Sequence, residues 1–248
     1  MSELFSIQLQ NRQQQGGDGV WLDLPTTTEQ VQVALRQIGI SSDNPQGLFI
    51  SGYFAEEEKR FAISYNMVLA SNVDELNFLA SRLETLSTGE RAELNAALQA
   101  PQSELFSIGR ITDFPENVDY YVHLPDVHGP AQLGDYYLNR SGMVNMPEEW
   151  KGGIDTAQFG RYVAQQEQGA FTQYGYLVKS GDEWQKVHEG QPVPEEYRVL
   201  SFPAPEVLRD AANIPPPVQP ETEPQKVIPI ILNGKDSAER MKEITDRL

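Results

Sequence analysis

The first seventy residues alternate apolar and polar side chains in short runs. Residues 4–10 place Phe5, Ile7 and Leu9 on one side, which is typical of a strand with one buried face. A polar, glycine-rich stretch then predicts a hairpin loop leading into a second strand over residues 20–24. Residues 48–54 predict a third strand. We therefore expect an N-terminal α+β domain over residues 1–70.

A helix is predicted between the second and third of these strands. Thr26 and Glu29 have the spacing of a capping box, in which each side chain accepts a backbone N–H at the start of a helix. Gly39 supplies the stop signal. Between these signals the apolar residues recur at helical spacing, at Val31, Ala34, Leu35 and Ile38.

The middle of the chain predicts helices only. Capping-box patterns occur at Asn72 with Glu75 and at Ser87 with Glu90, and an apolar stripe follows each of them. Because the linker between the two helices is short, we expect them to pack as an antiparallel pair. This predicts a central helical module over residues 71–103.

Residues 104–212 are mixed again and predict a C-terminal α+β domain. One helix surrounds residues 133–138 and ends at Gly142, and another begins at Asp155, faces inward with Phe159, Tyr162 and Val163, and ends at Gly169. Strands are predicted over residues 120–124, 174–179, 184–187 and 197–202, with a hairpin at 180–182. Because strands and helices come in groups, the fold class is α+β, with small antiparallel sheets flanking the helical module.

The last part of the chain changes composition. Residues 213–226 are rich in proline, as in an extended linker. Residues 227–248 contain an apolar run and then a helical pattern without a stop signal, which we interpret as a tail that starts a further module.

One hexapeptide occurs twice, over residues 2–7 and 103–108, with the sequence SELFSI. It is compatible with two related domains, each of which starts with the same strand. The similarity does not extend beyond the six residues, so a chance repeat is equally compatible with the sequence.

The charge is strongly negative. The chain has 36 Asp and Glu residues against 19 Lys and Arg residues, a net charge of −17. Direct binding of nucleic acid through a basic face is therefore not expected, because phosphate contacts need Lys and Arg. Since residues 213–248 hold six acidic and five basic residues, a net charge of −16 belongs to residues 1–212. Such acidity favours a basic partner, or serves solubility alone.

Motifs for catalysis are missing from the sequence. There is no cysteine, and His123 and His128 are not spaced to face one side of a helix as zinc motifs require. Phosphate-binding loops and the Gly-x-Ser-x-Gly elbow are also missing. Glu148 and Glu149 beside Trp150 are the best carboxylate pair for a hydrolase, but acids at a helix start are favoured by the helix dipole alone.

We therefore expect a protein that is not an enzyme and has no cofactor, no metal site and no membrane span. The lack of cysteine and of a signal-peptide pattern favours the cytoplasm.

Several segments together resemble the ArdA antirestriction family, over residues 4–202. The order and spacing of the segments carry the resemblance. They read VWLDLP at 20–25, ALRQIGI at 34–40, DELNFLASRLE at 74–84, LPDV at 124–127, LGDYYL at 133–138, IDTAQFGR at 154–161 and GAFTQYGY at 169–176.

The resemblance implies an elongated subunit of three domains and a homodimer joined through the third domain. It also implies that surface carboxylates follow the phosphate path of bent DNA and occupy the DNA-binding cleft of type I restriction–modification enzymes. The tail is similar to the entry into other modules of large mobile-element antidefence proteins. Some family members carry a dense acidic motif on a late helix, whereas residues 155–168 hold only Asp155 and Glu167 here. This difference leaves the target enzyme open.

The predicted phosphate-mimicking surface centres on residues 74–135, where eleven acids meet three bases. Duplex DNA carries one negative charge per about 1.7 Å of its axis, so a rigid row of carboxylates can replace it in a basic cleft. The expected partner-binding residues are Asp74, Glu75, Glu84, Glu90, Glu93, Glu104, Asp113, Glu116, Asp119, Asp126, Asp135, Glu148, Glu149 and Asp155.

Two other functions remain open at this point. An acidic interaction module of a mobile element would need no DNA mimicry, and its carboxylates could be scattered. A carboxylate-dependent hydrolase would bury two carboxylates in an aromatic cleft.

Overall fold

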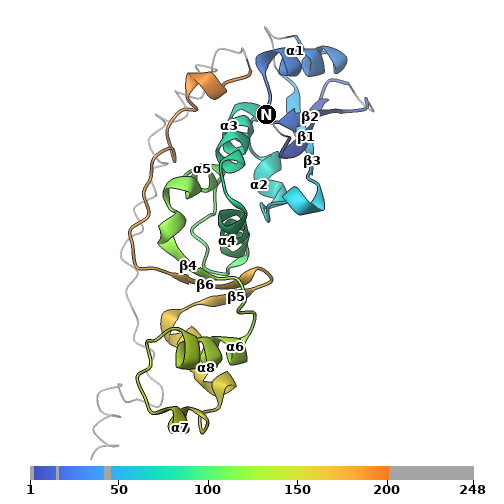
Figure 1. Ribbon diagram of the computed structural model, residues 1–248. Helices are drawn as coiled ribbons and strands as arrows, with labels where there is room; N and C mark the ends of the chain where they lie inside the picture. The colour runs from blue at the N-terminus through green and yellow to red at the C-terminus, as the bar shows by residue number, and fades with distance from the viewer. Residues whose placement is uncertain (1–2, 15–16, 42–45, 201–248) are drawn as a thin grey trace, which may run out of the picture. The chain divides into compact units, whose positions relative to one another are not determined.

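The computed structural model describes residues 3–14, 17–41 and 46–200, which belong to a compact unit of residues 1–202. The predicted α+β class is confirmed, because the α-helices are combined with two antiparallel sheets of three strands each (Figure 1). The predicted linker and tail, residues 213–248, lie outside the described residues. No helix in the described ranges has the length and apolar character needed to cross a membrane.

The first sheet contains β1 (Phe5–Asn11), β2 (Val20–Leu24) and β3 (Leu48–Phe54) in the order β2-β1-β3. All three strands were predicted. Ile7 pairs with Leu22 on one side and with Tyr53 on the other. The apolar side of β1 is fully buried, and the alternation therefore correctly predicted which face lies in the core.

Helix α1 (Thr28–Gln37) covers this sheet, but its capping box was predicted one residue too early. The box is formed by Thr27 and Gln30. The backbone N–H of Thr26 instead donates to the Asn77 side chain at 2.7 Å, so Thr26 is used to join β2 to a later helix. Gly39 follows the helix at a φ of 68°, a conformation that favours glycine, as the stop signal predicted.

Helices α3 (Val73–Glu84) and α4 (Thr88–Gln99) begin with the predicted capping boxes. The predicted antiparallel packing of the two is wrong. The apolar side of α3 packs against α5 (Ile108–Thr112) and β2, whereas α4 packs against the second sheet. Each helix thus has its own partner, and the short linker carries the chain from one to the other.

The second sheet contains β4 (Tyr121–Leu124), β5 (Ala170–Thr172) and β6 (Gly175–Lys179) in the order β4-β6-β5. The strands near 120–124 and 174–179 were predicted, but the hairpin joins β5 to β6 and not residues on either side of 180–182. The predicted strand at 184–187 is wrong, since this stretch is irregular. Its backbone is held by Asn117, whose side chain makes two hydrogen bonds with Gln185.

The predicted strand at 197–202 is also wrong in its described part. Residues 195–197 form the single-turn helix η5 (Glu195–Tyr197), and residues 198–200 are irregular. Side chains of α3 fix this stretch. Asp74 accepts the N–H groups of Val199 and Leu200 at 2.8 and 2.9 Å, and Asn77 donates to the Tyr197 carbonyl at 2.9 Å.

Helices α6 (Pro130–Asp135) and α8 (Thr156–Glu167) lie side by side (Figure 1). Their backbones approach closely at Gly134 and Gly160, where an added Cβ would meet a carbonyl oxygen of the facing helix within 2 Å. Tyr162 was predicted to face inward but is 61% exposed. The chain leaves α8 through Gln168 at a φ of 56°, so the left-handed residue precedes the predicted Gly169.

The remaining elements are short. The π-helical turn η4 (Tyr136–Arg140) continues α6 and completes the helix predicted there. The others are η1 (Glu57–Lys59), α2 (Tyr65–Leu69), η2 (Phe114–Glu116), η3 (Val118–Tyr120) and α7 (Glu148–Lys151).

A large buried cluster runs from Leu4 to Val199 and takes in the first sheet, α3, α4 and α5. A smaller one contains Val127, Leu133 and Tyr176 and lies where α6 and α8 meet the second sheet. The domain boundaries proposed near residues 70 and 103 stay predictions.

Candidate functional site

The predicted carboxylates fall into groups with different partners. One group accepts backbone N–H groups at helix starts. Glu75 and Glu90 complete the capping boxes of α3 and α4, and Asp155 accepts the N–H groups of Ala157 and Gln158 at 2.9 and 3.0 Å. Hydrogen bonds from Ser87 lower the pKa of Glu90. These carboxylates are charged and held in place by the helices that they cap.

A second group is fastened to the chain segment that follows β6. Asp74 holds residues 199 and 200, as described above. Asp113 is fully buried at the C-terminal end of α5, and its two carboxylate oxygens accept the N–H groups of Val187, His188 and Glu189 at 3.3, 2.7 and 3.2 Å. This carboxylate therefore holds a loop and is not accessible to a partner.

A third group is ion-paired. Glu104 binds Lys179 at 2.6 Å and Arg110 at 2.9 Å, and the hydrogen bond from Lys179 lowers its pKa. The other members of the group are Glu116 with Arg82, Asp135 with Arg140, and Glu148 with Lys151. Each of these pairs offsets one of the negative charges.

Glu93 on α4 differs from the rest. Burial, together with the neighbouring Glu90 and Asp119 carboxylates, raises its pKa to about 8. One of its carboxylate oxygens has no hydrogen-bond partner. Glu93 is therefore mostly protonated at neutral pH and contributes little negative charge there.

The carboxylates of Asp119, Asp126 and Glu149 are exposed, and they make no hydrogen bond or ion pair with the described part of the chain. Glu84, on the last turn of α3, is half-buried and has an interaction of its own. The three exposed carboxylates are the freest of the predicted set to meet a partner. The arrangement of the fourteen predicted carboxylates in a continuous strip stays a prediction.

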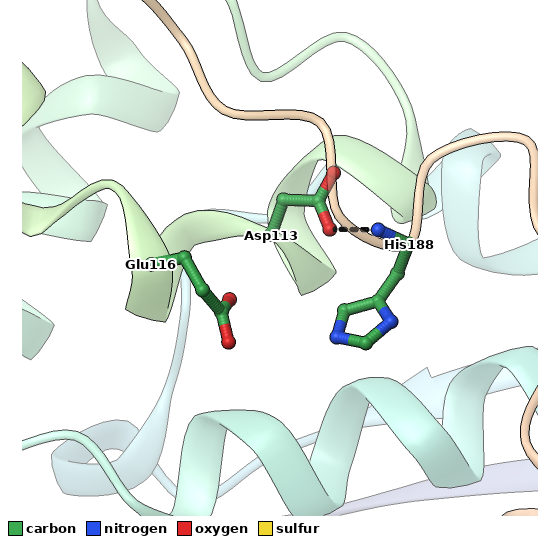
Figure 2. Close-up of side chains that lie close together, drawn as sticks. All are labelled: Asp113, Glu116 and His188. Atoms are coloured by element: carbon green, nitrogen blue, oxygen red, sulfur yellow. Dashed lines mark hydrogen bonds between the residues drawn. The ribbon is translucent and has the colours of Figure 1, made fainter.

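Two of these carboxylates lie close to a histidine at the end of α5 (Figure 2). Ligand atoms of Asp113, Glu116 and His188 lie within 4.8 Å of one another, as a metal site requires. Each group is already engaged, however. Asp113 binds the loop, Glu116 pairs with Arg82, and the His188 ring packs edge-on against Phe78 at 4.9 Å. A cation here would have to compete with the Arg82 guanidinium, so the arrangement is better suited to joining α3, η2 and the loop.

The family model described as antirestriction protein (ArdA) matches residues 17–178, which is more than half of the chain. The chain belongs to the ArdA family. A comparison with curated proteins finds no match. The family resemblance inferred from the sequence is thereby confirmed, and antirestriction, directed against restriction–modification enzymes, is the function that membership implies.

The ArdA match begins in the loop before β2 and ends in β6. It takes in every described element from β2 to β5 and spans all fourteen predicted carboxylates, from Asp74 to Asp155. The segment over residues 179–200 lies beyond the match, although Asp74 and Asp113 bind it.

The hypothesis of a carboxylate-dependent hydrolase has little support in this ArdA chain. Glu148 is 81% exposed and pairs with Lys151, and Trp150 beside it is 69% exposed. This pair is therefore not buried in an aromatic cleft, which the raised pKa of a catalytic acid would require. The ring of His123 contacts the Tyr174 carbonyl at 2.7 Å, which gives it a structural partner.

One acidic group was missed by the sequence analysis. Glu56, Glu57 and Glu58 are exposed at η1, shortly after β3, and among them only Glu56 forms an ion pair within the described structure, with Lys59 at 2.9 Å. Three consecutive acids could have indicated an acidic surface. They lie outside residues 74–135, where the acids outnumber the bases most strongly.

Proposed function

We propose that this protein is a DNA mimic that acts in the cytoplasm and occupies the DNA-binding cleft of a type I restriction–modification enzyme through its surface carboxylates. The observation that carries the proposal is the location of the charge: −16 of the net −17 belongs to residues 1–212, and a compact unit accounts for residues 1–202. A basic cleft that binds DNA attracts such a surface for the same reason that it attracts phosphates.

Fixed positions favour mimicry over a merely acidic surface. Glu75, Glu90 and Asp155 are charged side chains whose oxygens are tied to helix starts, so little conformational entropy is lost when a partner binds them. Asp119, Asp126 and Glu149 add charges that no described residue neutralises. Together they offer a partner both fixed and freely accessible carboxylates.

The test is competition with labelled DNA for a type I methyltransferase core over a series of salt concentrations. We expect displacement at low salt that weakens as salt rises. The triple variant Asp119→Asn, Asp126→Asn, Glu149→Gln should compete roughly tenfold less well, and its salt dependence should be shallower by about one unit of log–log slope per carboxylate.

The matched control keeps every charge: Asp119→Glu, Asp126→Glu, Glu149→Asp. This variant should compete as the unchanged protein does. Failure to displace DNA at low salt would contradict the proposal, and displacement that ignores salt would contradict its electrostatic mechanism. Binding to the enzyme without any competition would instead favour an acidic interaction module without mimicry.

The proposal includes a homodimer joined through the predicted domain of residues 104–212. The exposed large apolar side chains of this region include Met143 at 74%, Trp150 at 69% and Tyr162 at 61%. Side chains of this kind are enriched in the cores of interfaces.

We expect Trp150→Glu to convert a dimer into a monomer, measured by sedimentation equilibrium, since a buried charge without a partner opposes association. Phe54→Glu, at a half-exposed aromatic residue outside this region, serves as the control and should leave the dimer intact. A chain that is monomeric before any substitution would refute this part of the proposal.

A further inference from the structure

A groove lies between α1 and the edge strand β2. Its lining combines apolar and acidic side chains. Leu22, Val33 and Ala34 provide apolar surface, Trp21 borders the groove with its ring directed toward β3, and Asp23 and Glu29 add two carboxylates. No Lys or Arg is found among the described residues that line the groove.

Trp21 is held in position although 49% of it is exposed. Its ring packs edge-on against Phe54, with 6.4 Å between the ring centroids. Gly52 on β3 leaves room for the ring, because a Cβ added there would lie 3.0 Å from Cη2 of Trp21. A large aromatic side chain that is exposed but already ordered loses little entropy when a partner binds it.

The two carboxylates are available for a cation. Asp23 accepts a hydrogen bond from the Ser6 hydroxyl at 2.9 Å, which orients it without neutralising it. The pKa of Glu29 is lowered by its hydrogen bonds at the start of α1. Both groups therefore offer negative charge to the groove, where a guanidinium or ammonium group is attracted by the carboxylates.

The strand next to the groove has an open edge. Within the described ranges β2 pairs with β1 alone, so the backbone groups on its other side have no strand partner. Such an edge accepts an extended segment. The apolar lining would contact alternate side chains of that segment.

We propose that this groove binds an extended segment of a partner protein in which Arg or Lys alternates with apolar residues. The charge of the groove selects for a basic segment, and its apolar lining distinguishes it from a surface that only mimics phosphates. The inference goes beyond DNA mimicry, because it concerns a local peptide site formed by α1 and β2.

The probe is a short capped peptide in which valine alternates with arginine, titrated into the full chain and followed through the indole signal of Trp21 in NMR spectra. We expect saturable binding, with an affinity lowered about tenfold by Trp21→Ala and roughly threefold by each of Asp23→Asn and Glu29→Gln. A peptide with glutamate in place of arginine should not bind.

Two variants separate binding from folding. Trp21→Phe keeps an aromatic ring and should retain most of the affinity, measured by calorimetry. Phe106→Ala removes an exposed aromatic side chain far along the chain from α1 and β2 and should leave peptide affinity unchanged.

Equal binding of the basic and acidic peptides would overturn the proposal, as would unchanged affinity in Trp21→Ala. A groove occupied by a second copy of the chain would also overturn it, and would appear as loss of dimer in Trp21→Ala with no peptide binding. The DNA competition of Trp21→Ala should equal that of the unchanged protein, so the failure of either proposal can be told from the failure of the other.

Discussion

Gly160→Ala is expected to lower the free energy of unfolding of the α6–α8 region by about 3 kcal/mol, at the upper end of overpacking effects. A Cβ at this position would lie 1.8 Å from the Pro130 carbonyl oxygen, so the two helices would have to separate. The close approach is reciprocal, because a Cβ at Gly134 would lie 1.9 Å from the Thr156 carbonyl oxygen. Chemical denaturation, with hydrogen exchange of the α6 and α8 amides, measures the effect.

The matched control is Gly89→Ala in α4. A Cβ added at Gly89 meets nothing within 4 Å, so the same substitution should leave stability unchanged or raise it by up to about 1 kcal/mol, since alanine favours helix. If Gly160→Ala behaves in the same way, the crossing of α6 and α8 has room for a side chain and the packing described above is incorrect.

Asp113→Ala should cost about 4 kcal/mol of stability, because it removes a buried carboxylate and leaves three N–H groups without their acceptor. Those of Val187, His188 and Glu189 would lose their partner together. Asp113→Asn should cost less, since the amide oxygen still accepts. Urea denaturation gives the magnitude, and faster hydrogen exchange at residues 187–189 would show where the structure opens.

Asp126→Ala is the control, an exposed aspartate on the loop after β4 that should change stability by no more than about 0.5 kcal/mol. The same denaturation experiment tests whether the cluster of Asp113, Glu116 and His188 in Figure 2 binds a metal ion instead. If Zn²⁺ stabilises the unchanged protein and Asp113→Ala abolishes that effect while remaining folded, Asp113 is a metal ligand and the assignment to loop anchoring fails.

The sequence predicted the parts of the fold whose causes are local. The capping boxes of α3 and α4 each join residues three positions apart, and the alternation in β1 directly follows from one buried face. Where a contact with a distant residue competes with a local one, the predicted position of the element was wrong. Thr26 has a good capping sequence, but its N–H is bound by Asn77, 51 residues later, and the helix begins at the next position.

The repeated hexapeptide shows the same limit. In its first copy, Phe5–Ile7 lies in β1, whereas in the second copy residues 103–107 are irregular and Ile108 begins α5. Identical residues adopt different structures because Arg110 pairs with Glu104 and Glu189 and holds the second copy in place. Local sequence could not predict this, since Glu189 is 79 residues away.

The candidate site was predictable in composition but not in detail. Counting acids identified residues 74–135, yet the partners of Asp74 and Asp113 lie 125 and 75 residues further along the chain. Which carboxylates are occupied by the protein itself depends on these distant contacts. The exposed carboxylates can therefore be distinguished only once the fold is known.

In this chain the family match ends earlier than the folded structure does, because side chains inside the match bind the backbone of residues 185–200. The family match stops at residue 178, but Asp74, Asn77, Asp113 and Asn117 inside it all bind backbone groups beyond it. A gene fragment cut at the family boundary would leave these side chains and their pockets without partners and would encode an incomplete folding unit. Any insertion or fusion that preserves the ArdA fold must therefore leave the chain continuous to about residue 200, beyond the part that sequence comparison recognises.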